Sequence, residues 1–153
     1  MKFNKITIVL LLVLPLLGCN AISELKLQSS TDSAIRKEAP IPFQYTKKLI
    51  VVKAYLNDSK KANSFIFDTG AFQSKVEYDL SQELNLKTIS KRDNGTAQGV
   101  KREIEITSVD SISFSNSSFY NIGAGKLKYD ATSYSPCIAK DGIIGANLIK
   151  LAH

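Results

Sequence analysis

Apolar and polar residues alternate along much of the chain after residue 43, which predicts a protein made mainly of β-strands. Residues 49–56 read as a long strand, and residues 100–109 as a second strand that interleaves isoleucine with acidic and hydroxyl residues. Such alternation is typical of a strand with one buried face and one face in water. Further short strands are predicted at residues 43–45, 65–67, 75–78, 86–89, 112–114, 119–122 and 126–129.

Other local patterns predict one short helix and two places where strands turn. The helix is expected at residues 80–84, with Asp79 as its N-cap residue. Asp93-Asn94-Gly95 is typical of a hairpin turn, and with Gly99 it predicts a mobile, glycine-bounded hairpin tip. The glycines at positions 123 and 125 predict a bend or a β-bulge.

One apolar strand leads directly into an acid, a hydroxyl and a glycine. Residues 65–67 are Phe-Ile-Phe, and Asp68-Thr69-Gly70 follows at once. Because the strand would be buried, we expect the carboxylate of Asp68 at the edge of the core rather than in open water. Gly70 would let the backbone turn sharply. The same three residue types are common in ordinary turns, so the triplet alone does not identify a site.

A second apolar stretch near the end of the sequence is rich in glycine. Residues 141–150 read as a very short strand, Ile143-Ile144, that passes through Gly145 into the start of a helix. Asp141, just before it, is interpreted as a turn residue.

The N-terminal residues 1–18 have the layout of a secretory signal peptide. Two lysines precede an apolar run at residues 6–17, which is shorter than the roughly 20 residues that span a bilayer. Leu16-Leu17-Gly18-Cys19 resembles the bacterial lipobox, and this implies that Cys19 is acylated, for example with palmitate. The chain is then expected on a membrane of the bacterial cell envelope, on the periplasmic or outer-membrane side. An ordinary signal peptide and an uncleaved anchor are the alternatives.

Residues 19–42 are polar and serine-rich and are expected to form a tether, which leaves residues 43–153 as the folded lobe. The 20 basic and 14 acidic residues give a net charge of +6, but the basic residues fall in scattered pairs. No basic patch interleaved with aromatic residues is present, so no nucleic-acid partner is expected.

The few cysteines and histidines exclude several kinds of enzyme. Cys137 has no partner once Cys19 is acylated, and we expect it to be a free, buried thiol. The only histidine is His153, the last residue. A Cys/His or Ser/His/Asp hydrolase and a zinc site are therefore poorly supported.

Three motifs in this order resemble the retropepsin-like aspartic proteases, in particular their bacterial, membrane-tethered relatives. They are the strand into Asp68-Thr69-Gly70-Ala71, the glycine-bounded hairpin tip, and Ile143-Ile144-Gly145 followed by Asn147-Leu148. The resemblance covers about residues 43–150 and implies one closed β-barrel lobe with one or two short helices. It implies a hydrolase, an aspartic endopeptidase that acts on a peptide or protein substrate and uses no metal or organic cofactor.

The resemblance also assigns roles to single residues. It makes Asp68, Thr69 and Gly70 the catalytic triplet, with Thr69 bonding across to another lobe and the N–H of Gly70 facing the carboxylate. The residues that it implies for substrate binding, at and near the tip of a flap hairpin, are Ala71, Gly95, Thr96, Ala97, Gln98 and Gly99. The residues that it implies for structural support of the site are Ile143, Ile144 and Gly145.

The sequence departs from a complete aspartic protease in one major respect. Such enzymes use two carboxylates that share one proton, and no second Asp-Thr-Gly or Asp-Ser-Gly is present. The second lobe is therefore expected from a homodimer or from sequence missing beyond His153, and the chain is expected to be truncated at its C-terminus.

A second departure concerns residues that accompany the triplet. Retroviral members have Arg where this chain has Ala146, and acids where it has Phe72 and Gln73. Both sides of that ion pair are missing together, which favours a different branch of the family. The alternative functional hypothesis is a non-catalytic lipoprotein that uses the same fold for peptide binding or assembly, and a weaker one is a β-rich surface lipoprotein with chance motifs.

Overall fold

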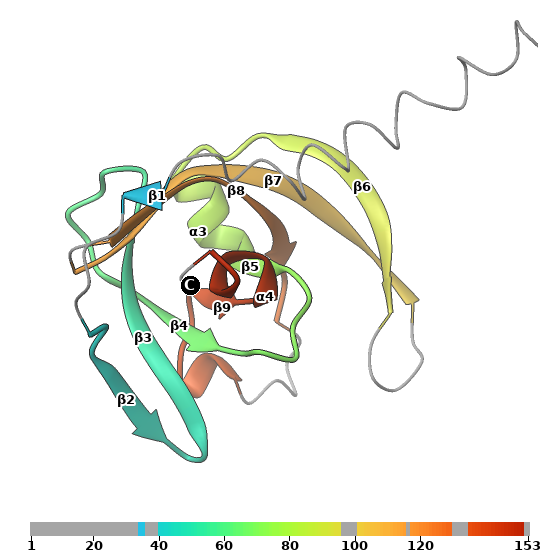
Figure 1. The fold of residues 1–153 in the computed structure, drawn as a ribbon. Coiled ribbons are helices and arrows are strands. Elements are labelled where there is room, and N and C mark those ends of the chain that lie inside the picture. The colour runs from blue at the N-terminus through green and yellow to red at the C-terminus, as the bar shows by residue number, and fades with distance from the viewer. Residues whose placement is uncertain (1–33, 36–39, 96–100, 116, 130–134, 152–153) are drawn as a thin grey trace, which may run out of the picture.

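The computed structural model describes residues 34–35, 40–95, 101–115, 117–129 and 135–151 (Figure 1). In these residues, β-strands predominate. The strands are β1 (Ala34–Ile35), β2 (Phe43–Thr46), β3 (Leu49–Leu56), β4 (Asn63–Phe67), β5 (Ser74–Glu77), β6 (Thr88–Gly95), β7 (Lys101–Phe114), β8 (Ser117–Leu127) and β9 (Gly142–Ile144). The helices are α3 (Tyr78–Glu83), the 3-10 helix η2 (Ser135–Cys137) and α4 (Ala146–Ile149). No helix in these ranges is long and apolar enough to span a bilayer.

The strands form a sheet that closes on itself. Its order is β1-β8-β5-β9-β4-β3-β7-β6, and β8 also pairs with β7, so the path from β8 through β5, β9, β4, β3 and β7 returns to β8. The β4–β9 and β5–β8 pairs are parallel, whereas β3–β4, β3–β7, β5–β9 and β7–β8 are antiparallel. A mixed barrel with two short α-helices results, which confirms the predicted fold class.

The inward-facing side chains of these strands form one main core. Its members lie on β3, β4, β5, β7, β8, β9 and both α-helices. The largest fully buried apolar side chains are Leu56, Phe65, Val76, Val109, Ile112, Ile122 and Ile144. Within β3, buried and exposed residues alternate from Val52 to Leu56, as the sequence pattern predicts.

The 6-residue helix α3 begins earlier than predicted. Its N-cap residue is Glu77, whose carboxylate accepts a hydrogen bond from the backbone N–H of Leu80 at 2.9 Å. The expectation that Asp79 caps the helix is therefore wrong. Asp79 lies in the first turn, where its negative charge still favours the helix dipole.

Two predicted turns or bends at glycines are also wrong, whereas the predicted hairpin tip at residues 95–99 lies, apart from Gly95, outside the described residues. Asp93, Asn94 and Gly95 belong to β6 and pair with Glu103, Arg102 and Lys101 of β7, so they do not form the turn. Strand β8 runs through positions 123 and 125 with an unchanged register against β7. In both places the long pairing with β7 overrides the local turn preference.

Two differences concern segments outside the barrel strands. Cys137 is free as expected, but it is exposed rather than buried. The predicted tether at residues 19–42 contains β1, which pairs with Phe119 and Ser118 of β8. The predicted signal peptide and Cys19 lie outside the described residues.

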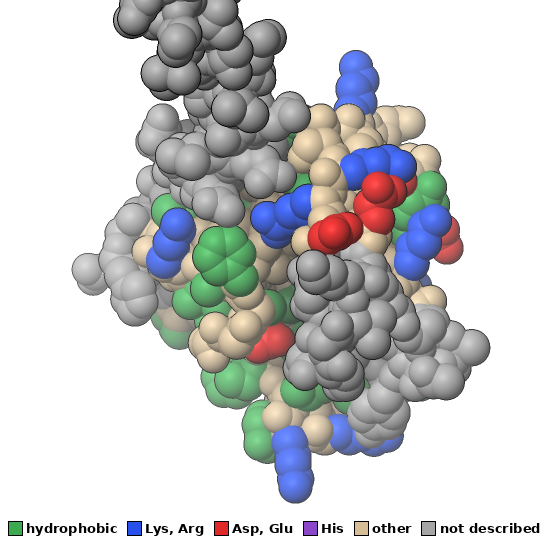
Figure 2. Space-filling model, turned by 90° about the vertical axis from the view of Figure 1, so that its right-hand side faces the viewer, with side chains coloured by type: hydrophobic (Ala, Val, Ile, Leu, Met, Phe, Trp, Pro, Cys, Tyr) green, Lys and Arg blue, Asp and Glu red, His purple; other side chains and the backbone are tan. Residues whose placement is uncertain are grey.

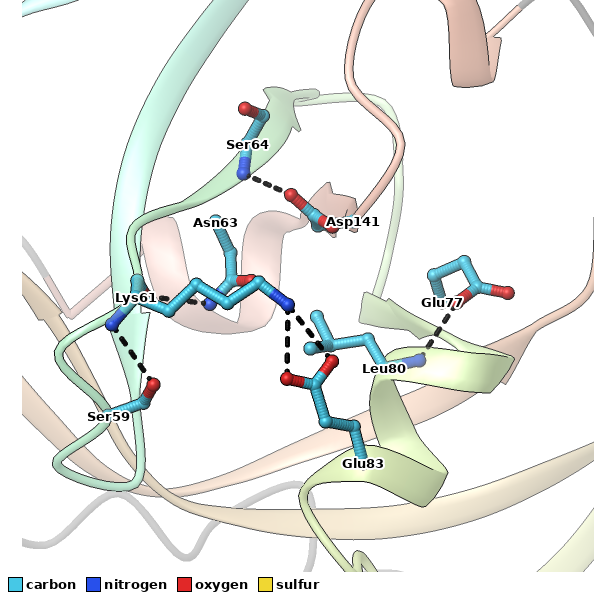
Figure 3. A network of polar contacts seen from close by, with 8 residues as sticks. All are labelled: Ser59, Lys61, Asn63, Ser64, Glu77, Leu80, Glu83 and Asp141. Carbon is cyan, nitrogen blue, oxygen red and sulfur yellow. Dashed lines mark hydrogen bonds and ion pairs between the residues drawn. The ribbon is translucent and has the colours of Figure 1, made fainter.

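A polar network ties the start of β4 to the segment that precedes β9 (Figure 3). The Asp141 carboxylate accepts the N–H of Ser64 at 2.6 Å, and the N–H of Asp141 donates to the Ser64 carbonyl at 3.2 Å. The Asp141 carbonyl accepts the N–H of Glu77 at 2.9 Å. Nearby, Lys61 forms an exposed ion pair with Glu83 at 3.0 Å. Asp141 thus acts as a turn residue that joins three segments.

Replacing Gly142 with alanine should destabilise the fold by about 3 kcal/mol. Gly142 has a φ of 143°, and an added Cβ would lie 2.1 Å from the carbonyl oxygen of Lys75. Chemical denaturation measures the change. Lys140→Ala, at an exposed position two residues earlier, is the matched control and should change stability by less than about 0.5 kcal/mol. Equal stabilities of the two variants would contradict the prediction.

Candidate active site

Asp68 lies directly after β4, at the edge of the buried core. Its backbone N–H donates to the Ile144 carbonyl at 3.0 Å, continuing the parallel β4–β9 pairing. One carboxylate oxygen, Oδ1, accepts the N–H of Gly70 at 2.9 Å. This is the contact that the resemblance implies for Gly70. The Asp68 side chain is only partly buried, and Thr69 and Gly70 are exposed, so a second group can approach the carboxylate from solvent.

The segment after β9 runs beside the loop that follows Asp68. The N–H of Ala146 donates to the Ala71 carbonyl at 2.7 Å, and the N–H of Asn147 donates to the Phe72 carbonyl at 3.2 Å. Gly145 makes this approach possible, because an added Cβ would lie 2.6 Å from the carbonyl carbon of Gln73 and 2.7 Å from the Ala71 oxygen. The two backbones are packed so closely that no side chain fits between them.

A relay of side-chain hydrogen bonds fixes the end of this loop. Asn147 Oδ1 accepts from both the backbone N–H of Ser74, at 2.7 Å, and its hydroxyl, at 2.9 Å. The Ser74 hydroxyl accepts the N–H of Gly145 at 3.0 Å, and Asn147 Nδ2 donates to the Gly123 carbonyl at 2.8 Å. Ser74 was not among the predicted site residues. The signal in the sequence was Asn147 itself, a polar residue within the otherwise apolar stretch that follows Gly145.

Of the other predicted site residues, the structure places Ile143 and Ile144 beside β4 and Asp68. Ile144 is fully buried in the main core, and Ile143 packs against a smaller cluster of Val51, Ile66 and Ala139. Gly95 is the last residue of β6 and pairs with Lys101. Thr96, Ala97, Gln98 and Gly99 lie outside the described residues.

An apolar cavity of about 420 Å³ opens beside Phe67 and Ile144, the residues that precede and support Asp68. Its walls come from β2, β3, β4, β7, β8, β9 and α4 and from residue 41. The lining residues are Ile41, Phe43, Ile50, Val52, Phe67, Phe114, Phe119, Ile144, Leu148 and Ile149. Phe43 is 61% exposed, and Phe72, in the loop after Asp68, is 67% exposed. Apolar surface of this kind is typical of a binding face.

A second, polar cavity lies at the other end of β4, around Asp141, Glu77, Lys61 and Tyr129. Burial raises the pKa of Tyr129 to about 12, and the charges of Glu77 and Asp141 add to the shift, so this phenol stays neutral near pH 7. Asp141 bonds to Ser64 near the start of β4, whereas Asp68 follows the last residue of β4. The two acids therefore lie at opposite ends of this strand. The described residues contain no cluster of three or more His, Cys, Asp or Glu side chains that could hold a metal ion.

Charged side chains are mixed over the surface. Figure 2 shows one face, on which Lys and Arg side chains are dispersed and most of the Asp and Glu side chains lie close to several of them. Two of the exposed ion pairs are Lys61 with Glu83 and Lys91 with Glu103.

Comparisons with known proteins agree with the geometry. A family model described as aspartyl protease matches residues 52–148. A solved structure, a retropepsin-like aspartic protease from Rickettsia conorii, matches with a TM-score of 0.50 and 16% identity, covering 77% of each chain. This likeness confirms the retropepsin-like fold. The comparison with curated proteins found no match.

Replacing Asn147 with alanine should destabilise the protein by about 2 kcal/mol, because the N–H of Ser74 and the carbonyl of Gly123 would lose their partners inside the fold. The free energy of unfolding in urea measures this. Lys150→Ala, at an exposed position near the end of the same helix, serves as control. A loss in the Asn147 variant no larger than in the control would show that the relay does not hold the loop.

Proposed function

We propose that this chain, which belongs to the aspartyl protease family, forms one lobe of an endopeptidase in which Asp68 activates a water molecule. The single observation that supports this most strongly is the position of Asp68. A buried strand carries it to the core edge, the N–H of Gly70 holds one of its oxygens, and solvent can reach it.

The proposed chemistry requires a second carboxylate close to the first. Two like charges about 3 Å apart cannot both ionise, so the pair retains one proton over a wide pH range. The ionised member takes a proton from water, while the protonated member polarises the carbonyl of the scissile amide. In this proposal Asp68 is one member of the pair, and a copy of the same residue is the other.

We assign the second carboxylate to a second copy of this chain. The sequence has one Asp-Thr-Gly triplet, and a second copy would supply another in the same surroundings. Thr69 is exposed and available for a hydrogen bond to a facing lobe. The exposed Phe72 beside it, and the apolar cavity that opens next to Phe67, offer surface that a second lobe would cover.

For the place of action, we propose a lipid-anchored form on the bacterial cell envelope. The pattern Leu16-Leu17-Gly18-Cys19 after an apolar run supports acylation of Cys19. The segment before residue 43 would then hold the lobe near the membrane surface.

The first test replaces Asp68 with asparagine, which keeps the size of the side chain but removes its capacity to accept a proton. Cleavage of a peptide library by the concentrated protein should fall by about 1,000-fold or more. The control is Asp110→Asn, at an exposed position on β7, which should retain activity.

Unchanged cleavage by the Asp68 variant would refute the assignment. A concentrated wild-type protein that neither cleaves peptides nor binds a statine-type transition-state mimic would favour the non-catalytic peptide-binding hypothesis.

The second test mixes wild-type protein with an excess of the Asp68→Asn variant. If each active centre takes one Asp68 from each of two copies, mixed pairs are inactive, and activity per wild-type chain should fall as the fraction of variant rises. An excess of Asp110→Asn should cause no loss. Activity that is independent of added variant would show that the second carboxylate is not donated by another copy.

A further inference from the structure

Strands β6 and β7 form a long hairpin (Figure 1), and Arg92 lies on β6. In the register of these strands Arg92 is opposite Ile104, and Ser90 is opposite Ile106, which is 3% exposed. Side chains opposite each other on paired strands share a face. Arg92 therefore belongs to the face that packs toward the barrel.

The neighbouring charged side chains lie on the opposite, outer face of the hairpin. Lys91 lies opposite Glu105, and its ammonium group forms an ion pair with Glu103 at 3.1 Å. The Lys91 and Glu103 side chains are 56% and 62% exposed. Hence the outer face of the hairpin has paired charges in water, whereas the inner face carries a guanidinium.

The Arg92 guanidinium donates a hydrogen bond to Oε1 of Gln73. Gln73 is 9% exposed and lies three residues after Gly70, in the loop that carries the catalytic triplet. This contact brings the guanidinium to the space between the hairpin and the loop after Asp68.

The partner of Arg92 is neutral, and this matters for what else the guanidinium can bind. A guanidinium has five N–H donors and pairs best with a carboxylate, in a two-bond geometry. Among the ion pairs found in the described part of the chain, none includes Arg92. Gln73 orients the group through one acceptor without neutralising its charge.

We propose that Arg92, oriented by Gln73, selects substrates with an Asp or Glu side chain at the position that passes between the β6–β7 hairpin and the catalytic loop. The proposal rests on the proposed function, since it names the substrate class for the same site. The substrate carboxylate would accept hydrogen bonds from the guanidinium donors that Gln73 does not use. Both partners would be shielded from water between hairpin and loop, which strengthens such a bond.

The test uses a peptide that the wild-type protein cleaves and that contains glutamate, compared with versions in which each Glu is replaced by Gln. At one position this replacement should lower kcat/KM for the wild type by about tenfold or more. With Arg92→Gln the difference between the two peptides should disappear, while cleavage of the Gln peptide is retained. Lys91→Gln removes the same charge from the adjacent, outward-facing position and should leave the preference intact.

A second variant separates selection from a merely structural contact. Gln73→Glu keeps a partner for Arg92 but supplies an internal carboxylate, so the preference for acidic peptides should be lost although the hairpin remains attached to the loop. If the contact were only a structural latch, Arg92→Gln would slow all peptides equally and Gln73→Glu would slow none. That result, or a wild type with no preference for Glu at any position, would overturn the proposal. Absence of cleavage of any peptide by the wild type would instead refute the proposed function, and this inference with it.

Discussion

The parallel pairing of β4 with β9 is the constraint on which the rest of the structure depends. Residues 65–67 pair with residues 142–144. This register places Asp68 where its backbone N–H donates to the Ile144 carbonyl. Once the two strands are paired, the chain after each of them must share a narrow space. Gly145 satisfies that requirement by having no side chain, and Asn147 then bonds the end of the loop. The site is thus a consequence of backbone pairing more than of any single side chain.

Local sequence pattern was sufficient for the strand that carries Asp68 and for β9, because each has an uninterrupted apolar run ended by an acid or a glycine. The start of the helix after Gly145 was also predicted. The sequence pattern failed where pairing with a strand distant in sequence determines the local structure. Asp93-Asn94-Gly95 has strong turn preferences, but pairing with β7 extends it as a strand. Glu77 rather than Asp79 caps α3, since the cap depends on where β5 ends, which is fixed by its pairing with β8.

The side-chain contacts around the site could not be predicted from the sequence for the same reason. Ser74 and Asn147 are 73 residues apart in sequence, and Arg92 and Gln73 are 19 apart on separate elements. Neither pair produces a periodic signal, and each becomes visible only when the barrel is closed. The motifs nonetheless predicted which two segments lie side by side, the loop after Asp68 and the segment after β9, because glycines and a carboxylate in a fixed order reflect backbone geometry that few other arrangements require.

The linkage between residues 68–74 and 141–147 also has a consequence for folding. Contacts between segments so far apart in sequence require closure of a long loop before they form, and non-local contacts of this kind slow folding. A nascent or partly folded chain in which residues 141–147 have not docked lacks the bonds that hold the Asp68 loop. In such a chain the Asp68 loop is not assembled, so whatever this loop does is confined to molecules that have completed the barrel.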